Sequence, residues 1–315
     1  MADKYNKRIA ILSGILGVLA LTYTATLVLD PETVNARNAL FTWLDKKYAD
    51  QADRIELSGA DGMTTLVRHN DVWFVSRNDT EYPAKQDRIK DFLKILTGKG
   101  RYPVRGTAAA SLERFGLAEK TASRAVIRGG GSAALLDLLV GDSDSAGREV
   151  YLRKNGENEV RSGEDKLSSY IDSPTPAWLD LRLFPESLSA ESVQRVTVYS
   201  LEGPGGPPQV LTREGATWTI TGIQNPDPQR VESYIRSILE AVGEDFLDEN
   251  VPDLPPEPAG IALELGNGQT RRISVGPLLE SNRRMAEVAG SSFKYLLAEW
   301  TVNRLFRNDS YFERQ

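Results

Sequence analysis

The feature that most constrains the fold is a phrase that the sequence contains twice. NDVWFVSRNDTEYPAKQDRIKDFLKIL occupies residues 70–96, and GATWTITGIQNPDPQRVESYIRSIL occupies residues 215–239. Each copy has a strand-like alternation, then a proline-containing turn, then apolar residues at the i, i+3, i+4, i+7 spacing of an amphipathic helix. Two further strand-like runs precede the phrase each time. The sequence therefore predicts two β-β-β-α units.

The similarity continues beyond these units at a constant offset of 135 residues. The offset places Val126 on Ile261, Val140-Gly141 on Val275-Gly276, Val150 on Met285, Val160 on Tyr295 and Leu167 on Val302. Copies of this length indicate a duplicated domain, because solenoid repeats have periods of only 20–50 residues. The strands follow one another without a crossover helix between each pair, which favours antiparallel pairing.

We therefore expect an α+β protein in which one N-terminal transmembrane helix is followed by two duplicated domains, each an antiparallel sheet with helices. The expected first domain spans residues 51–184, a linker spans 185–192, the second domain spans 193–307, and a C-terminal tail spans 308–315. Proline-rich stretches interrupt the second copy at 203–208 and 252–258.

The predicted transmembrane helix is the run from Ile9 to Leu29, which contains no charged residue. At 1.5 Å per residue it is long enough to cross a hydrocarbon core of about 30 Å, and it exceeds the usual apolar region of a cleavable signal peptide. Basic residues lie in the preceding segment 1–8, which the positive-inside rule places in the cytoplasm. We expect a single-pass protein of the bacterial inner membrane with its main part in the periplasm. Residues 30–50 are expected to be helical, as a stalk or packed on the first domain.

Four small residues form a stripe along the predicted span. Ser13, Gly17, Ala20 and Thr24 recur at steps of four, three and four. Such a stripe allows another helix to approach closely, although small residues are also common in membrane spans generally. It suggests that the span packs against the helices of an integral-membrane protein complex.

Composition excludes several classes of function. The net charge is −6 with scattered basic residues, so the footprint of a nucleic-acid-binding protein is missing. The chain has no cysteine and a single histidine, His69, which excludes thiol catalysis, disulfides, cysteine-ligated metal and a multi-histidine metal site within one chain. No cofactor is expected.

The remaining candidate sites have structural explanations at the level of sequence. The glycine-rich stretch at 128–133 is interpreted as a hairpin turn, because the Lys-Ser/Thr of a phosphate loop is missing. Asp142 and Asp144 lie in a loop that lacks the full calcium-ligand pattern. His69 adjoins the turn pair Asn70-Asp71 and is expected at a surface hairpin. Trp73 and Trp218 occupy equivalent strands and are expected to pack in the core.

Together these features resemble a known bacterial family, the domain-of-unknown-function family 4340. The resemblance is carried by the N-terminal span, the tandem repeat, Phe115-Gly116-Leu117, Val140-Gly141 before a variable loop, and WLDLRLF at 178–184. It implies a membrane-anchored extracytoplasmic protein. Members are often encoded beside gliding-motility-type ABC transporter subunits, which implies an auxiliary role outside the membrane. It supplies no catalytic residues. The second copy has no clear Phe-Gly-Leu counterpart.

The expected function is that of a non-enzymatic, single-span accessory subunit with a binding or scaffolding ectodomain, auxiliary to an ABC-type transporter. Its partner would be an integral-membrane complex, contacted through the span and the ectodomain, with no nucleic acid. One alternative is a structural subunit of a respiratory or photosynthetic complex. Another is a membrane-tethered hydrolase of envelope polymer, which would need converging carboxylates with shifted pKa values.

Overall fold

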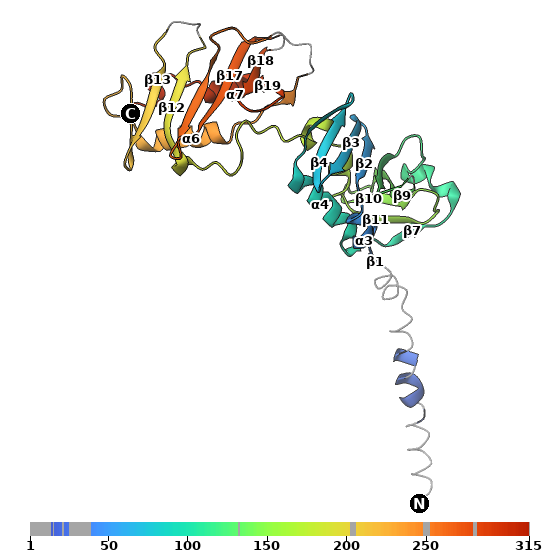
Figure 1. Cartoon of the computed structure of the whole chain (residues 1–315). Helices are drawn as coiled ribbons and strands as arrows, with labels where there is room; N and C mark the ends of the chain where they lie inside the picture. The colour runs from blue at the N-terminus through green and yellow to red at the C-terminus, as the bar shows by residue number, and fades with distance from the viewer. Residues whose placement is uncertain are drawn as a thin grey trace, which may run out of the picture. The chain divides into compact units, whose positions relative to one another are not determined.

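The computed structural model describes residues 14, 16–20, 22–24, 39–131, 133–201, 206–247, 253–279 and 282–314. The chain divides into two compact units, Met1–Leu179 and Asp180–Gln315, each of which is described here on its own. Both are built mainly from antiparallel sheet with a few helices, so the protein belongs to the α+β class (Figure 1).

The first unit contains a nine-stranded antiparallel sheet within its described residues. The strands follow the order β5-β4-β3-β2-β8-β9-β10-β11-β7 across the sheet. They are β2 (Arg54–Gly59), β3 (Gly62–His69), β4 (Val72–Arg77), β5 (Thr80–Pro83), β7 (Val104–Gly106), β8 (Ser123–Arg128), β9 (Ala134–Ser143), β10 (Glu149–Lys154) and β11 (Val160–Glu164). The chain thus runs to one edge at β5, crosses to the opposite edge at β7, and returns to the middle, where β8 pairs with β2.

Local sequence explains the first hairpins. Asn70 and Asp71, between β3 and β4, have φ angles of 49° and 65°, and Asn78 and Asp79, between β4 and β5, have 51° and 60°. Two successive residues at positive φ match the twist of paired strands, and Asn and Asp tolerate this conformation better than most side chains. These two Asn-Asp pairs therefore set the register of the β3–β4–β5 meander.

Helices cover one face of this sheet. The helix α4 (Gln86–Thr97) buries Ile89, Phe92 and Leu96, as its spacing predicts. The short helix α5 (Ser168–Ile171) and the 3-10 turn η3 (Thr175–Trp178) follow β11. Trp178 is fully buried, and its ring lies 6.0 Å from that of Phe92. Ile55, Leu57, Ala125 and Ile127 line the same core, paired across β2 and β8.

The second unit repeats this architecture within its described residues. Its eight strands follow the order β14-β13-β12-β16-β17-β18-β19-β15. They are β12 (Val193–Tyr199), β13 (Gln209–Glu214), β14 (Thr217–Ile220), β15 (Asp245–Phe246), β16 (Ala259–Leu265), β17 (Thr270–Leu278), β18 (Arg283–Val288) and β19 (Lys294–Ala298). Helix α6 (Pro228–Leu239) follows β14 and helix α7 (Glu299–Leu305) follows β19. Asp227 caps α6 by accepting hydrogen bonds from the backbone N–H groups of Gln229 and Arg230.

The two sheets have the same strand order: the eight strands from β4 to β7 in the first unit correspond one by one to the eight from β14 to β15 in the second. Residues related by the offset of 135 fall in corresponding strands, as with Val126 in β8 and Ile261 in β16. The second unit has no named strand beside β14 in its described part, whereas β5 covers β4 in the first. The two units therefore share one topology and differ at an edge.

The boundary between the units lies at Leu179, earlier than the expected end of the first domain at 184. The WLDLRLF motif is divided by it. Trp178 packs in the first unit, whereas the backbone carbonyl of Leu181 accepts a hydrogen bond from Gly243 and the N–H of Leu183 donates to Ala241. These bonds hold the second half of the motif in the second unit.

Residues 30–50 were expected to be helical, as a stalk or packed on the first domain; the described part does pack on the first unit, but only four of its residues are helical. Residues 39–50 form the strand β1 (Leu40–Phe41) and the four-residue helix α3 (Lys46–Ala49). β1 pairs with β6 (Gly100–Arg101), and Trp43 is buried against Tyr102, with ring centroids 5.2 Å apart. Tertiary pairing therefore overrides the helical spacing. Residues 30–38 lie outside the described part of the chain.

Most of the predicted span, residues 9–29, also lies outside the described residues. Within the part that is described, no helix has the length and apolar character needed to cross a bilayer. Of the small-residue stripe, Ser13 lies outside the described residues, whereas Gly17, Ala20 and Thr24 are helical. The Thr24 hydroxyl donates a 2.9 Å hydrogen bond to the backbone carbonyl of Ala20. A Cβ atom added at Gly17 would meet nothing within 4 Å.

Candidate functional site

The segment that precedes β8 crosses the face of the first sheet opposite the helices. It forms the 3-10 turns η1 (Ala109–Ser111) and η2 (Glu113–Phe115) and then places Leu117 against Leu139 and Val160. Successive residues of a strand point to opposite faces, so Leu139 packs here while Leu138 lies in the main core. This second, small core also contains Leu112, Phe115, Ala122 and Tyr151.

The Phe-Gly-Leu and Val-Gly motifs contact each other at this crossing. A Cβ atom on Gly141 would lie 2.1 Å from the backbone oxygen of Phe115, well inside van der Waals contact. Gly116, at the end of η2, has a φ of 67°, a conformation that glycine adopts readily. The glycines of both motifs therefore allow the segment to lie directly on strand β9.

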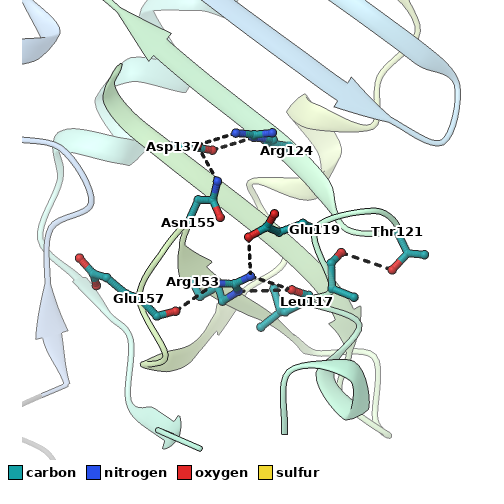
Figure 2. A network of polar contacts seen from close by, with 9 residues as sticks. Leu117, Glu119, Thr121, Arg124, Asp137, Arg153, Asn155 and Glu157 are labelled. Carbon is teal, nitrogen blue, oxygen red and sulfur yellow. Dashed lines mark hydrogen bonds and ion pairs between the residues drawn. The ribbon is translucent and has the colours of Figure 1, made fainter. Parts of the chain in front are cut away.

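A polar network fixes the same segment to the sheet (Figure 2). Arg153, only 4% exposed, donates from Nε and Nη2 to the backbone oxygen of Leu117 at 3.3 and 3.2 Å, and from Nη1 to that of Glu157 at 3.0 Å. Glu119 lies 4.0 Å from this guanidinium. Because a buried charge is costly unless it is hydrogen-bonded, these carbonyls are essential to the packing of Arg153.

Beside it, Asp137 accepts two hydrogen bonds from Arg124, at 2.8 and 2.6 Å, and one from Asn155 at 2.9 Å. Burial acts to raise the pKa of Asp137, but the bonds from Arg124 and Asn155 outweigh it and lower the pKa below its usual range. A carboxylate held in this way stays ionised and has its oxygens occupied. This cluster is suited to joining β8, β9 and the turn after β10, and not to proton transfer.

The equivalent crossing in the second unit is different. Gly276 corresponds to Gly141, and a Cβ atom there would lie 2.9 Å from Cδ2 of Leu254 and 3.3 Å from Cε of Met285. The proline-rich stretch thus occupies the place of the Phe-Gly-Leu segment. From the sequence this stretch was only a proline-rich interruption of the second copy, and its contact with the sheet was not predicted.

The proline-rich stretch leaves an open cavity of about 560 Å³ beside Gly276. The lining is formed by Ser200, Leu201, Asp253, Pro255, Pro256, Glu257, Ala259, Val275, Gly276, Pro277 and Arg284. Its walls are mainly apolar, and Arg284 is held at the rim by a 3.1 Å hydrogen bond from Nη1 to the backbone oxygen of Gly276. Pockets of this size with apolar walls and few polar groups are typical of binding sites.

The other residues singled out in the sequence have structural roles. His69 lies at the end of β3, its side chain 58% exposed, with Nε2 3.0 Å from a carboxylate oxygen of Glu81. Asp144 accepts hydrogen bonds from the backbone N–H groups of Arg148 and Glu149, which lower its pKa and organise the β9–β10 loop. Among the described residues, no group of three or more His, Asp or Glu side chains is placed to hold a metal ion.

Trp73 and Trp218 occupy matching positions in β4 and β14 and are buried. A guanidinium covers each ring: that of Arg68 lies 5.6 Å from the Trp73 centroid, and that of Arg213 lies 5.0 Å from the Trp218 centroid. Such cation–π pairs stabilise the packing of each ring. Core packing of both tryptophans is confirmed, and the arginines were not predicted.

A comparison of the sequence with known protein families tests the resemblance that these motifs suggested. The sequence model of a family described as a domain of unknown function (DUF4340) matches residues 73–260, more than half of the chain. The chain belongs to the DUF4340 family. The match includes Trp73, the Phe-Gly-Leu and Val-Gly motifs and the start of β16, and so spans parts of both units. No curated protein and no solved structure matches this DUF4340 chain.

Sequence reasoning did not find the cavity. The proline-rich stretch gave one signal, because a stiff segment beside a sheet strand cannot follow its surface closely. The missing Phe-Gly-Leu counterpart in the second copy was a second signal. Together these two signals could have predicted that the segment crossing the sheet of the second unit of this DUF4340 protein packs less closely than its counterpart in the first unit.

Proposed function

We propose that this DUF4340 protein is a non-enzymatic accessory subunit of the bacterial inner membrane, anchored by one span at residues 9–29. Its two α+β units, derived from one duplicated domain, would form a binding module in the periplasm. The uncharged run Ile9–Leu29 and the basic residues before it support the anchor and its orientation. The common strand order of the two units supports the duplication.

The observation that carries the binding role is the difference between the two crossings. The first unit fills the face above Gly141 with its own Leu117 and Phe115 side chains. The second leaves about 560 Å³ beside Gly276. Among the described residues of the second unit, no counterpart of Leu117 and Phe115 fills this apolar cavity, which favours an external occupant because burying apolar surface stabilises a complex.

The partner that we propose is an extracytoplasmic segment of an ABC-type transporter, which inserts an apolar side chain into this cavity. Leu201, Pro256 and Val275 would contact that side chain, and Arg284 and Glu257 at the rim would contact its polar neighbours. The stripe of Ser13, Gly17, Ala20 and Thr24 would give a second contact within the membrane.

The first experiment is extraction of the full-length protein from its native membrane in a mild detergent, followed by mass spectrometry of the proteins that co-purify at constant ratio. We expect transporter subunits. Haem-, pigment- or quinone-binding subunits would instead assign the protein to an energy-converting complex. A protein that migrates alone would contradict the proposal.

A pair of variants tests the cavity itself. Pro256→Glu introduces a charge into the lining at an exposed position, so the fold should tolerate it. Pro207→Glu makes the same change at another exposed proline of the second unit, one that does not belong to the lining. We expect the first variant to lose the partner and the second to retain it. Equal retention by both would exclude the cavity as the binding site.

A further inference from the structure

A second cavity, of about 660 Å³, lies in the first unit where α4 ends and β6 begins. Its lining is Lys94, Ile95, Gly98, Lys99, Gly100, Arg101, Tyr102, Pro103, Arg105, Glu149, Glu164 and Lys166. Five of these side chains are basic and two are acidic, in a chain whose net charge is −6. The cavity is therefore a local concentration of positive charge.

The two carboxylates are already neutralised by their neighbours. Glu149 accepts hydrogen bonds from the Ser162 hydroxyl at 2.6 Å and from Arg105 at 2.8 Å, and these bonds lower its pKa. Glu164 pairs with Lys166 at 2.6 Å. Each carboxylate thus forms an ion pair with one of the five basic side chains.

Three cations remain: Lys94, Lys99 and Arg101. No carboxylate of the described residues lies within ion-pair distance of any of them. They converge on the cavity from the end of α4, from the turn and from β6. Like charges gathered around one concave space repel one another unless an anion is bound among them.

The second unit does not repeat this arrangement. After α6, which corresponds to α4, the chain carries Glu240 and Glu244 in the turn that leads to β15. Glu244 binds Arg283 through two hydrogen bonds of 2.5 and 3.1 Å. The positive charge at the end of α4 thus does not follow from the shared topology, because the corresponding turn of the second unit carries acidic side chains.

We infer that this cavity binds a phosphoryl anion, carried by the headgroup of an anionic phospholipid or by a soluble phosphate compound. Three cations are enough to neutralise a phosphoryl group and can donate to several of its acceptor oxygens, and Arg101 adds a planar donor set suited to it. The volume accommodates a headgroup and exceeds the need of a bare ion.

The position of the cavity in the chain favours the lipid source. β6, which contributes Arg101, pairs with β1, the first named strand of the unit. Only residues 30–39 separate β1 from the end of the predicted span, and ten residues reach at most about 35 Å. This argument rests on the proposed membrane anchor, whereas binding of a soluble phosphate does not.

The test uses the full-length protein in an uncharged maltoside detergent. Equilibrium dialysis measures radiolabelled inorganic phosphate, and intrinsic tryptophan fluorescence measures titration with dioctanoyl phosphatidylglycerol or, for comparison, dioctanoyl phosphatidylcholine. The cavity variant is Lys99→Gln with Arg101→Gln. The matched control, Lys90→Gln with Lys120→Gln, removes two exposed charges of the same unit outside the lining.

We expect the cavity variant to bind the anion about tenfold more weakly than the wild type and the control, with binding that weakens as salt rises. Inorganic phosphate binding assigns a soluble source and stands even if the anchor proposal fails. Binding of phosphatidylglycerol without phosphate or phosphatidylcholine assigns the headgroup. Binding of neither anion, or equal binding by the cavity variant, overturns the inference.

Discussion

Gly141 lies directly beneath the backbone carbonyl of Phe115. The distance from an added Cβ atom to that oxygen would be only 2.1 Å. The atom in conflict is backbone, which cannot rotate away as the end of a flexible side chain can. The approach of these two residues fixes how the segment before β8 lies on the first sheet.

We therefore expect Gly141→Ala to lower the free energy of unfolding by about 1–3 kcal/mol, because the segment must move off the strand. Gly131→Ala is the control, since its Cβ atom would meet one atom at 3.9 Å, an ordinary contact. Urea denaturation of both variants measures the difference. Equal stability would show that the segment adjusts without cost.

Replacement of Arg153 tests the polar network. Arg153→Met keeps most of the side-chain volume but leaves the carbonyls of Leu117 and Glu157 without their donors. We expect a loss of about 1–3 kcal/mol, the cost of unsatisfied buried groups. Arg148→Met, at an exposed position in the nearby loop, should change the free energy of unfolding little. A similar effect of both substitutions would contradict the role of the network.

Low pH should weaken the contribution of Asp137 to the free energy of unfolding. Its pKa is lower in the folded protein than in the unfolded chain, so the folded state prefers the ionised form. The stabilisation is fully present above the unfolded pKa, about 3.9, and is lost as the pH falls through the lowered folded pKa. We expect Asp137→Asn to be less stable than the wild type at pH 6 and the difference to narrow towards pH 2. Urea titrations at both pH values measure it, and a constant difference would contradict the assignment.

Tyr234 joins the two helices of the second unit. Its buried hydroxyl donates a 2.6 Å hydrogen bond to the backbone oxygen of Leu305, and burial raises its pKa, so the phenol remains protonated. We expect Tyr234→Phe to cost about 1 kcal/mol, measured by chemical denaturation. Tyr311→Phe, at a half-buried ring, is the comparison. An unchanged free energy of unfolding for Tyr234→Phe would show that water replaces the bond.

Patterns that depend on neighbours in sequence predicted the structure well. The Asn70-Asp71 turn, the buried face of α4 and the alignment of Val126 with Ile261 all follow from local spacing or from the repeat. The strand β1 did not, because its pairing with Arg101 involves residues about 60 positions away. The helical spacing of residues 40–48 gave the opposite expectation.

The two cavities likewise could not be predicted from local sequence patterns. Nothing in the local sequence after α4 indicated that Lys99 and Arg101 face one space with Lys94. Likewise, the contact of Leu254 with the sheet follows from a crossing that is neither periodic nor conserved in form between the two units. Sites formed by the ends of several elements depend on tertiary geometry, which single-sequence spacing does not contain.

The pairing of β2 with β8 in the middle of the first sheet has a consequence for how the chain must fold. Ile55 and Ile127, directly opposite each other, are 72 positions apart, and Val196 and Leu263 in the second sheet are 67 apart. Closing such long loops slows folding relative to local pairing. During synthesis, the β2–β4 meander emerges with its central edge unpaired and must wait for β8. If the chain is exported as it is made, it would most need protection from aggregation while this strand edge is exposed.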